Sequence, residues 1–210
     1  MIALIDYGSG NLRSVQNALR HEGADPVLAS DPGHLHDAGA DAVVLPGVGA
    51  FGDCVDGLRS RGLWAPLQEW LSSGKPFLGI CVGYQLLFEE SEESPGVAGF
   101  GVFAGRVRRF STPGLKIPQI GWNRLQLTAP PHPLWSGLPP KPHVYFVHSY
   151  FPEPRDQSIV TARAEYGELF AAAVGRGNIA GVQFHPEKSQ EVGLAILRNF
   201  VSACRVTVSA

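Results

Sequence analysis

The chain has 210 residues, of which 44% are hydrophobic, and this is enough to bury a full core in one domain over residues 1–210. Only 17% of the residues are charged, the net charge is −2, and Lys and Arg form no run, so we do not expect a nucleic-acid-binding protein. No apolar run approaches the roughly 20 residues that cross a bilayer, so we predict no membrane span.

The start of the chain and its cysteines predict a compartment. Met1 leads directly into an apolar segment, without the basic start of a secretory signal. The three cysteines, Cys54, Cys81 and Cys204, are odd in number and far apart, which argues against a disulfide framework and for a reducing compartment. We therefore expect a cytoplasmic protein.

The first forty residues have the pattern of an α/β fold. Ile2–Asp6 is an apolar strand that leads into the glycine-containing loop Y-G-S-G-N. Asn11 is a suitable N-cap for a helix that should stop near Gly23. Pro26–Ala29 is a weak second strand, and we expect the following D-P-G-H-L-H-D to be a loop.

Two partial ligand patterns occur in this region. Gly8 and Gly10 suggest a dinucleotide fingerprint, but Arg13 stands where that motif needs its third glycine. His34 and His36 are suitable metal ligands, but a catalytic zinc takes three protein ligands and no third one is near. We predict neither a cofactor nor a metal.

A third strand, Ala42–Leu45, ends in the segment P-G-V-G-A-F-G-D, from Pro46 to Asp53. Three glycines at the carboxyl end of a strand allow backbone N–H groups to approach a ligand closely, so this loop is a candidate oxyanion hole. The alternative is a simple turn. Asp53–Ser73 then has helical spacing, with weak points at Gly57 and Gly62.

The segment K-P-F-L-G-I-C-V-G-Y-Q, from Lys75 to Gln85, has the strongest functional pattern. Pro76–Ile80 predicts a strand buried on both faces, and Val82–Glu90 predicts a helix, so Cys81 should lie on the turn between them. G-x-C-x-G follows the logic of the G-x-S-x-G nucleophile elbow. A helix start favours the reactive thiolate. The alternative is a buried structural cysteine, and the flanking glycines favour a nucleophile.

The second half of the chain predicts mainly β structure. Glycine and proline are frequent between Val97 and Pro142, which indicates β-ribbons and loops. A terminal helix should include Leu194–Phe200. Between Pro142 and this helix we predict four strands, of which the last three form antiparallel hairpins. They are Val144–Tyr150, Ile159–Tyr166, Leu169–Val174 and Ile179–Phe184.

G-V-Q-F-H-P-E-K-S, from Gly181 to Ser189, supplies the groups that a cysteine nucleophile needs. A strand should end at His185, and Pro186 disfavours a helical conformation there. Alternation along an extended chain then directs His185 and Glu187 to the same side. His185 can accept the thiol proton and Glu187 can orient the imidazole. The alternatives are a capping histidine and a solvated glutamate.

G-I-C-V-G-Y-Q together with Q-F-H-P-E resembles the class I, Cys-His-Glu triad family of glutamine amidotransferases over the full length. This resemblance implies a flavodoxin-like α/β fold, with a mostly parallel central sheet flanked by helices and added antiparallel strands in the C-terminal half. It also implies catalysis by the triad and a glutamine substrate. The implied oxyanion donors are the N–H of Val82 and one from Val48 or Gly49. The implied glutamine-binding residues are Gly49, Gly52, Gln85, His148, Ser149 and Tyr150.

More narrowly, D-Y-G-S-G-N-L, P-Q-I-G-W-N and Y-F-V-H-S-Y resemble the glutaminase subunits of imidazole glycerol phosphate synthases. That resemblance implies a heterodimer with a (β/α)₈ cyclase. Candidate interface residues are Asn11, Trp122, Tyr145 and Lys188, although Trp122 could equally be a core residue. The alternatives are the glutaminase subunit of another amidotransferase, a stand-alone cysteine peptidase or γ-glutamyl hydrolase, and a non-enzymatic binding module on the same fold.

Overall fold

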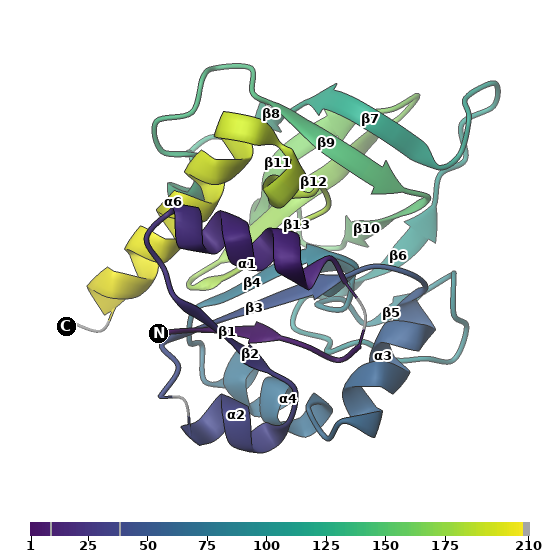
Figure 1. Cartoon of the computed structure of the whole chain (residues 1–210). Coiled ribbons are helices and arrows are strands. Elements are labelled where there is room, and N and C mark those ends of the chain that lie inside the picture. The colour runs from purple at the N-terminus through teal and green to yellow at the C-terminus, as the bar shows by residue number, and fades with distance from the viewer. Residues whose placement is uncertain (9, 38, 208–210) are drawn as a thin grey trace.

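The computed structural model describes residues 1–8, 10–37 and 39–207, and in these residues a central eight-stranded sheet organises the chain (Figure 1). The strands β2, β1, β3, β4 and β13 pair in parallel, and β12, β11 and β8 continue the sheet antiparallel. In spatial order they are β2 (Pro26–Ala29), β1 (Ile2–Ile5), β3 (Ala42–Gly47), β4 (Phe77–Cys81), β13 (Ile179–Val182), β12 (Leu169–Arg176), β11 (Val160–Glu165) and β8 (Gln126–Leu127).

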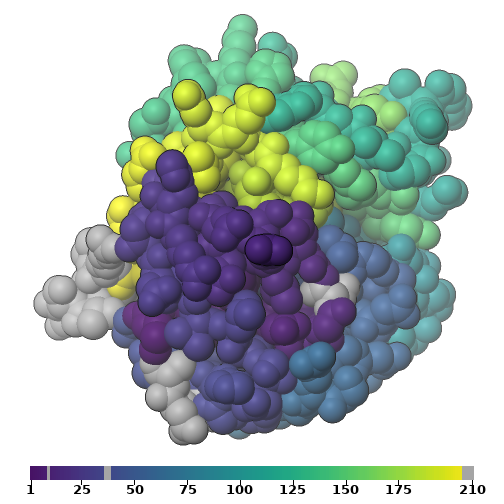
Figure 2. Space-filling view, viewed as in Figure 1, coloured from purple at the N-terminus to yellow at the C-terminus, as the bar shows by residue number. Residues whose placement is uncertain are grey.

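Helices cover both faces of this sheet (Figure 1). α1 (Leu12–His21) and α6 (Gln190–Thr207) pack side by side on one face, and their atoms adjoin on the surface in Figure 2. α2 (Pro32–Asp37), α3 (Phe51–Ser60) and α4 (Trp64–Ser72) lie on the other face. Both faces are thus shielded from water, which explains why β1, β3 and β4 are continuous apolar runs.

Two smaller sheets lie beyond the carboxyl ends of the parallel strands (Figure 1). One contains β10 (Tyr150–Pro154), β6 (Gly105–Arg109) and β5 (Glu90–Ser91). The other pairs β7 (Gln119–Arg124) with β9 (His143–His148). The four-residue helix α5 (Val82–Gln85) and three short 3₁₀ turns, η1 (Pro133–Trp135), η2 (Gln157–Ile159) and η3 (Pro186–Lys188), complete the described elements. None of the described helices is long and apolar enough to cross a membrane.

The predicted architecture is confirmed: a mostly parallel sheet with helices on both faces, and antiparallel strands added in the C-terminal half. The hairpins of β11, β12 and β13 have the predicted antiparallel pairing. Two predictions in the first half were wrong. The segment predicted as a loop after β2 forms the helix α2, and the helix predicted over Asp53–Ser73 is two helices. The break lies at Gly62, whose φ of 68° is incompatible with a continuous right-handed helix.

Two further predicted elements are shorter than expected. The helix predicted over Val82–Glu90 is α5, which ends at Gln85. The carbonyl groups of Leu86 and Leu87 instead accept hydrogen bonds from the N–H groups of Phe100 and Phe103, so a later segment of the chain replaces the next helical turn. The strand predicted over Val144–Tyr150 divides at Ser149 into β9 and β10, which belong to different sheets.

Candidate active site

Three neighbouring parallel strands bring the predicted catalytic segments to one edge of the sheet. β3 and β13 flank β4, with Gly47 opposite Cys81 and Val182 opposite Ile80. The residues that follow these strands therefore meet at the carboxyl edge, where open α/β sheets bind ligands. His185 arrives at this edge from β13 and Val48 arrives from β3.

Cys81 lies at a strained bend between β4 and α5. Its φ is 56° and its ψ is −111°, which is an unfavourable conformation for a residue with a side chain. A Cβ atom on Gly79 would lie 2.5 Å from the carbonyl oxygen of Gly83, and one on Gly83 would lie 1.9 Å from the carbonyl oxygen of Leu45. The two glycines are thus required for close backbone packing, while Cys81 itself adopts the positive φ of the elbow.

The short length of α5 changes one part of the sequence-based argument. α5 has four residues, Val82–Gln85, so it carries little of the macrodipole that a long helix would direct at the thiol. Stabilisation of a thiolate at Cys81 must therefore come mainly from neighbouring side chains and backbone N–H groups.

His185 and Glu187 contact one another, as the sequence predicted, but through a different backbone geometry. β13 ends at Val182, and Glu187 lies in the 3₁₀ turn η3 rather than on an extended strand. His185 Nδ1 lies 2.9 Å from Glu187 Oε1, and both side chains are almost fully buried. Burial lowers the pKa of His185, but hydrogen bonds to Cys81 and Glu187 and their negative charges outweigh it and raise this pKa to about 10. The arrangement therefore holds a proton on the imidazole beside the sulfur.

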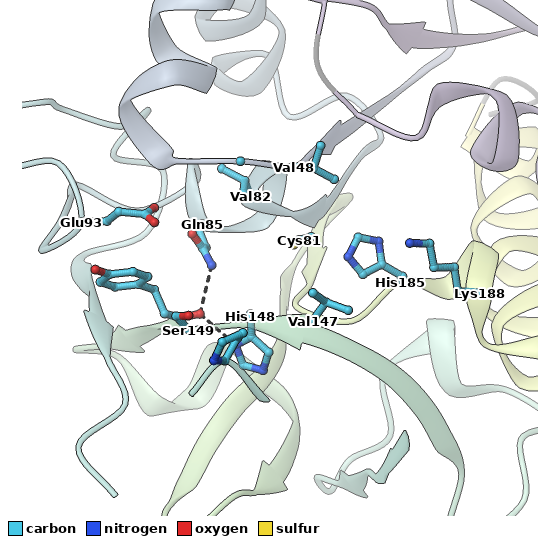
Figure 3. A pocket seen from close by; sticks show the side chains of 13 residues that line it. Val48, Cys81, Val82, Gln85, Glu93, Val147, His148, Ser149, His185 and Lys188 are labelled. Atoms are coloured by element: carbon cyan, nitrogen blue, oxygen red, sulfur yellow. Dashed lines mark hydrogen bonds between the residues drawn. The ribbon is translucent and has the colours of Figure 1, made fainter. Parts of the chain in front are cut away.

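A cavity of about 310 Å³ opens in front of Cys81 (Figure 3). Of the residues that the sequence assigned to glutamine binding, Gly49, Gln85, His148, Ser149 and Tyr150 line it, as do Val48, Val82 and Lys188. Gly52 does not line the cavity. It lies in the first turn of α3, where its N–H donates a 2.9 Å hydrogen bond to Ser94 Oγ. The predicted residues thus surround one cavity, with Gly52 supporting it from outside.

Sequence reasoning did not identify three residues of the cavity wall, Glu93, Pro118 and Val147. Glu93 brings a carboxylate to the cavity, and its Oε2 accepts a 2.9 Å hydrogen bond from the N–H of Phe51 at the start of α3. Glu93 belongs to a cluster of acids, Glu89 to Glu93, that looks like a solvated surface. Only the contact with α3, far away in the sequence, distinguishes it.

His148 is a buried, neutral member of the cavity wall. Its Nδ1 lies 2.9 Å from the carbonyl oxygen of Tyr150, and its Nε2 lies 3.0 Å from the side-chain amide of Gln119. Burial and, to a lesser degree, the charge of His185 lower the pKa of His148 to about 4, although the hydrogen bond to Tyr150 opposes them. Because a carbonyl can only accept, the single proton of the neutral ring lies on Nδ1.

The candidate oxyanion loop is anchored from behind. Cys54 Sγ donates to the carbonyl oxygen of Val48 at 3.6 Å, and the hydroxyl of Tyr7 donates to Cys54 Sγ at 3.3 Å. Burial raises the pKa of Cys54 to about 11, so it remains a thiol and can donate. A trans peptide directs its C=O and N–H oppositely, so the N–H of Gly49 points away from Cys54.

The four candidate interface residues lie in different surroundings. Trp122 on β7 is 48% exposed, which excludes the core alternative, and it packs edge-on against Tyr145 of β9. Lys188 lies in the wall of the cavity. Asn11 precedes α1 but makes no side-chain capping bond there, contrary to the expected N-cap interaction.

Metal-ligand groups do not gather in the described residues: no three His, Cys, Asp or Glu side chains there could hold an ion. His34 is exposed and its Nδ1 lies 2.8 Å from Asp31. The side chain of His36 lies outside the described part of the chain. All three cysteines, Cys54, Cys81 and Cys204, are free and buried.

Comparison with known proteins identifies the family to which this site belongs. The family model "Glutamine amidotransferase class-I" matches residues 3–204. The imidazole glycerol phosphate synthase subunit HisH of Trichodesmium erythraeum is 52% identical over 96% of this chain and 94% of its own length. The HisH subunit of Trichormus variabilis is 49% identical over 100% of this chain and 99% of its own length.

A solved structure described as a glutamine amidotransferase shares the fold. It superimposes with a TM-score of 0.76 over 98% of this chain and 100% of its own, at 20% identity. The chain therefore belongs to the class-I glutamine amidotransferases, and within them to the family of imidazole glycerol phosphate synthase subunit HisH.

Proposed function

We propose that this glutamine amidotransferase hydrolyses glutamine to glutamate and ammonia as the glutaminase subunit of an imidazole glycerol phosphate synthase. The observation that carries the proposal is the convergence of Cys81 with the hydrogen-bonded pair His185 and Glu187 at one cavity. In this proposal residues 1–210 act as a single amidotransferase domain. The cytoplasmic location expected from the free cysteines stays a prediction.

The chemistry follows from the three side chains. The thiolate of Cys81 attacks the side-chain amide carbon of glutamine, and the tetrahedral intermediate collapses to a γ-glutamyl thioester as the C–N bond breaks. His185 protonates the leaving nitrogen, which departs as ammonia, and then takes a proton from the water that hydrolyses the thioester. Glu187 holds the imidazole through Nδ1, which leaves Nε2 for the reacting groups.

Negative charge on the carbonyl oxygen of the intermediate requires backbone donors. The proposed donors are the N–H of Val82, directly after the nucleophile, and one from the loop that contains Val48 and Gly49; all three residues line the cavity. We further propose that this loop presents its donor fully only when a partner engages. Such control would prevent glutamine from being hydrolysed when no acceptor is present.

The cavity also has groups that suit the amino-acid end of glutamine. Glu93 supplies a negative charge for the α-ammonium group, and its position is fixed by the N–H of Phe51. Gln85, His148, Ser149 and Tyr150 form the adjoining wall and would position the rest of the substrate. The volume of about 310 Å³ is at the lower end of the range for small-molecule sites, which suits a single amino acid.

Ammonia is useful only if it reaches an acceptor before it escapes, so the proposal includes a second enzyme. The proposed partner is a (β/α)₈ cyclase that combines ammonia with a phosphoribulosyl-formimino aminoimidazole carboxamide ribonucleotide. Its products would be imidazole glycerol phosphate and an aminoimidazole carboxamide ribonucleotide. The proposed docking face contains Asn11, Trp122, Tyr145 and Lys188, and exposed aromatic residues such as Trp122 often dominate interfaces.

A glutaminase assay with and without the cyclase and its ribonucleotide tests the proposal. We expect slow glutamine hydrolysis by the isolated chain and strong stimulation by the loaded partner. Cys81→Ala should abolish glutamine-dependent synthesis by the complex and leave ammonia-dependent synthesis intact. A full rate without partner and ligand would refute the control by the loop, and loss of both syntheses in Cys81→Ala would refute the assigned role of Cys81.

A further inference from the structure

A fully buried amide lies directly behind the nucleophile. Gln183 follows β13, two residues before His185, and its side chain is 0% exposed. Its Nε2 lies 3.8 Å from Cys81 Sγ, and its Oε1 lies 3.1 Å from Gln85 Nε2. Its backbone N–H donates to the carbonyl oxygen of Ala172 on β12, which fixes the residue at the end of the sheet. Neither the triad nor the cavity wall includes this side chain.

The direction of the Gln183 amide is determined by its neighbours. Gln85 Nε2 also lies 3.1 Å from the carbonyl oxygen of Tyr150, and that oxygen can only accept. The Gln85 amide must therefore direct its NH₂ group to Tyr150, and the second hydrogen of this group points to Gln183 Oε1. An oxygen held in this way leaves the NH₂ of Gln183 facing the sulfur of Cys81. A reversed amide would bring a nitrogen donor against the donor of Gln85.

The geometry points to Gln183 as a positioning residue for Cys81, a role that rests on the proposed nucleophilic function of this cysteine. The side-chain NH₂ group of Gln183 donates to the sulfur of Cys81. This hydrogen bond stabilises the thiolate and holds the sulfur in one orientation. A thiolate at this 5% exposed position has little contact with water, so a fixed donor is valuable there. The four-residue helix α5 supplies little of this stabilisation.

An amide suits this task because it cannot take the proton that His185 needs. Gln183 approaches Cys81 from β13 and donates without titrating at neutral pH. The bonds from Gln183 through Gln85 to Tyr150 also connect the sulfur with the cavity wall. The orientation of the nucleophile therefore depends on residues that line the substrate cavity.

The reaction of Cys81 with iodoacetamide in the full chain tests this role, because alkylation needs no glutaminase activity. We compare the wild type with Gln183→Met, in which a side chain of similar length lacks the donor. The matched control is Gln119→Met, which removes another buried amide that bonds to His148 and not to Cys81. Alkylation of Cys81 is followed by peptide mass spectrometry, which separates it from Cys54 and Cys204.

We expect Gln183→Met to slow alkylation of Cys81 by about tenfold or more, since a hydrogen bond to a charged group is lost, and to reduce the thiolate absorbance at neutral pH. Gln119→Met should leave both properties near those of the wild type. An alkylation rate in Gln183→Met within about twofold of the wild type, which is less than one such bond contributes, would overturn the role.

A measurement on the wild type covers the case in which Gln183→Met fails to fold. The side-chain amide resonances of Gln183 should shift when iodoacetamide alkylates Cys81, and those of Gln119 should stay in place. Equal shifts at both amides would overturn the assignment. If alkylation depends on Gln183 but glutamine is never hydrolysed, the positioning role survives and the proposed function fails.

Discussion

The two sides of the cavity are held in place by different means. On one side, β3, β4 and β13 bring Cys81 to the edge of the parallel sheet, and close backbone contacts at Gly79 and Gly83 fix it there. On the other side, β7, β9 and β10 form a wall that belongs to smaller sheets. This wall is held by side-chain hydrogen bonds around His148 and by a cluster of aromatic rings around Phe110.

The two sides of the cavity should therefore respond differently to substitution. Backbone contacts between adjacent strands leave the nucleophile little freedom. Side-chain contacts between distant segments can change one at a time without disturbing the sheet. The nucleophile side should therefore tolerate almost no substitution of its glycines, and the wall should respond in graded steps to substitution and to pH.

Gly83→Ala should have the largest effect. The added Cβ would lie 1.9 Å from the backbone oxygen of Leu45, so the elbow or β3 must shift. We expect the free energy of unfolding to fall by roughly 3–5 kcal/mol, or the variant to fail to fold. Gly74→Ala is the control, since its φ is 68° but no atom lies within 4 Å of the added Cβ. That variant should lose only about 1 kcal/mol. Equal losses in denaturant unfolding would contradict the comparison.

His148→Gln tests the wall through its pH dependence. The pKa of buried His148 is lowered to about 4, against 6.5 in an unfolded chain. Below pH 6.5 the unfolded state therefore binds more protons at this position, and folding stability falls until the pH reaches about 4. Between pH 7 and 5 this difference in proton binding should lower the free energy of unfolding of the wild type by about 2 kcal/mol. Chemical unfolding at both pH values should show a shallower loss in the variant, and an unchanged slope would contradict the assignment.

The nucleophile side could be predicted from the sequence because its constraints are local. G-I-C-V-G contains the strand end, the bend and the glycines within five residues, and H-P-E places His185 two residues from its partner. Even there, the reason given for the contact was wrong, because η3 rather than an extended chain brings Glu187 to His185. The residue types and their spacing predicted the pair, while the backbone conformation that joins them remained open.

The rest of the site could not be predicted in this way, because its contacts join distant parts of the chain. Glu93 is positioned by Phe51, and Gln183 is oriented through Gln85 by Tyr150. α5 ends early because Phe100 and Phe103 supply donors to carbonyl groups that a longer helix would have used. Neither residue spacing nor helix propensity contains these pairings. For the wall, the resemblance to a family was the informative signal.

Glu168→Gln should weaken the support of the wall by a smaller amount. Hydrogen bonds from Arg108 lower the pKa of Glu168, and Arg108 also lies over the ring of Phe151 on β10 at 4.3 Å. The pair contributes stability above the ordinary pKa of a glutamate, and this contribution is lost as the pH falls through the lowered value. Because the pair lies at the surface and both side chains keep some contact with water, at 20% exposure for Arg108 and 25% for Glu168, we expect the free energy of unfolding to fall by only about 0.5–1 kcal/mol at neutral pH. Chemical unfolding should give the same free energy for the wild type and the variant in acid. A difference between them that grows as the pH falls would contradict the ion pair.

Trp122→Ala should have the smallest effect on the isolated chain, because Trp122 lies on the outer surface of the wall and is 48% exposed. Its loss should change the free energy of unfolding by only about 0.5 kcal/mol. Leu169→Ala is the matched control, since Leu169 is also 48% exposed but lies on β12. If the outer surface of β7 and β9 docks the cyclase, Trp122→Ala alone should weaken association by about 1–2 kcal/mol, measured by titration calorimetry. Equal affinity in both variants would move the docking face elsewhere and leave Trp122 as an exposed side chain of the wall.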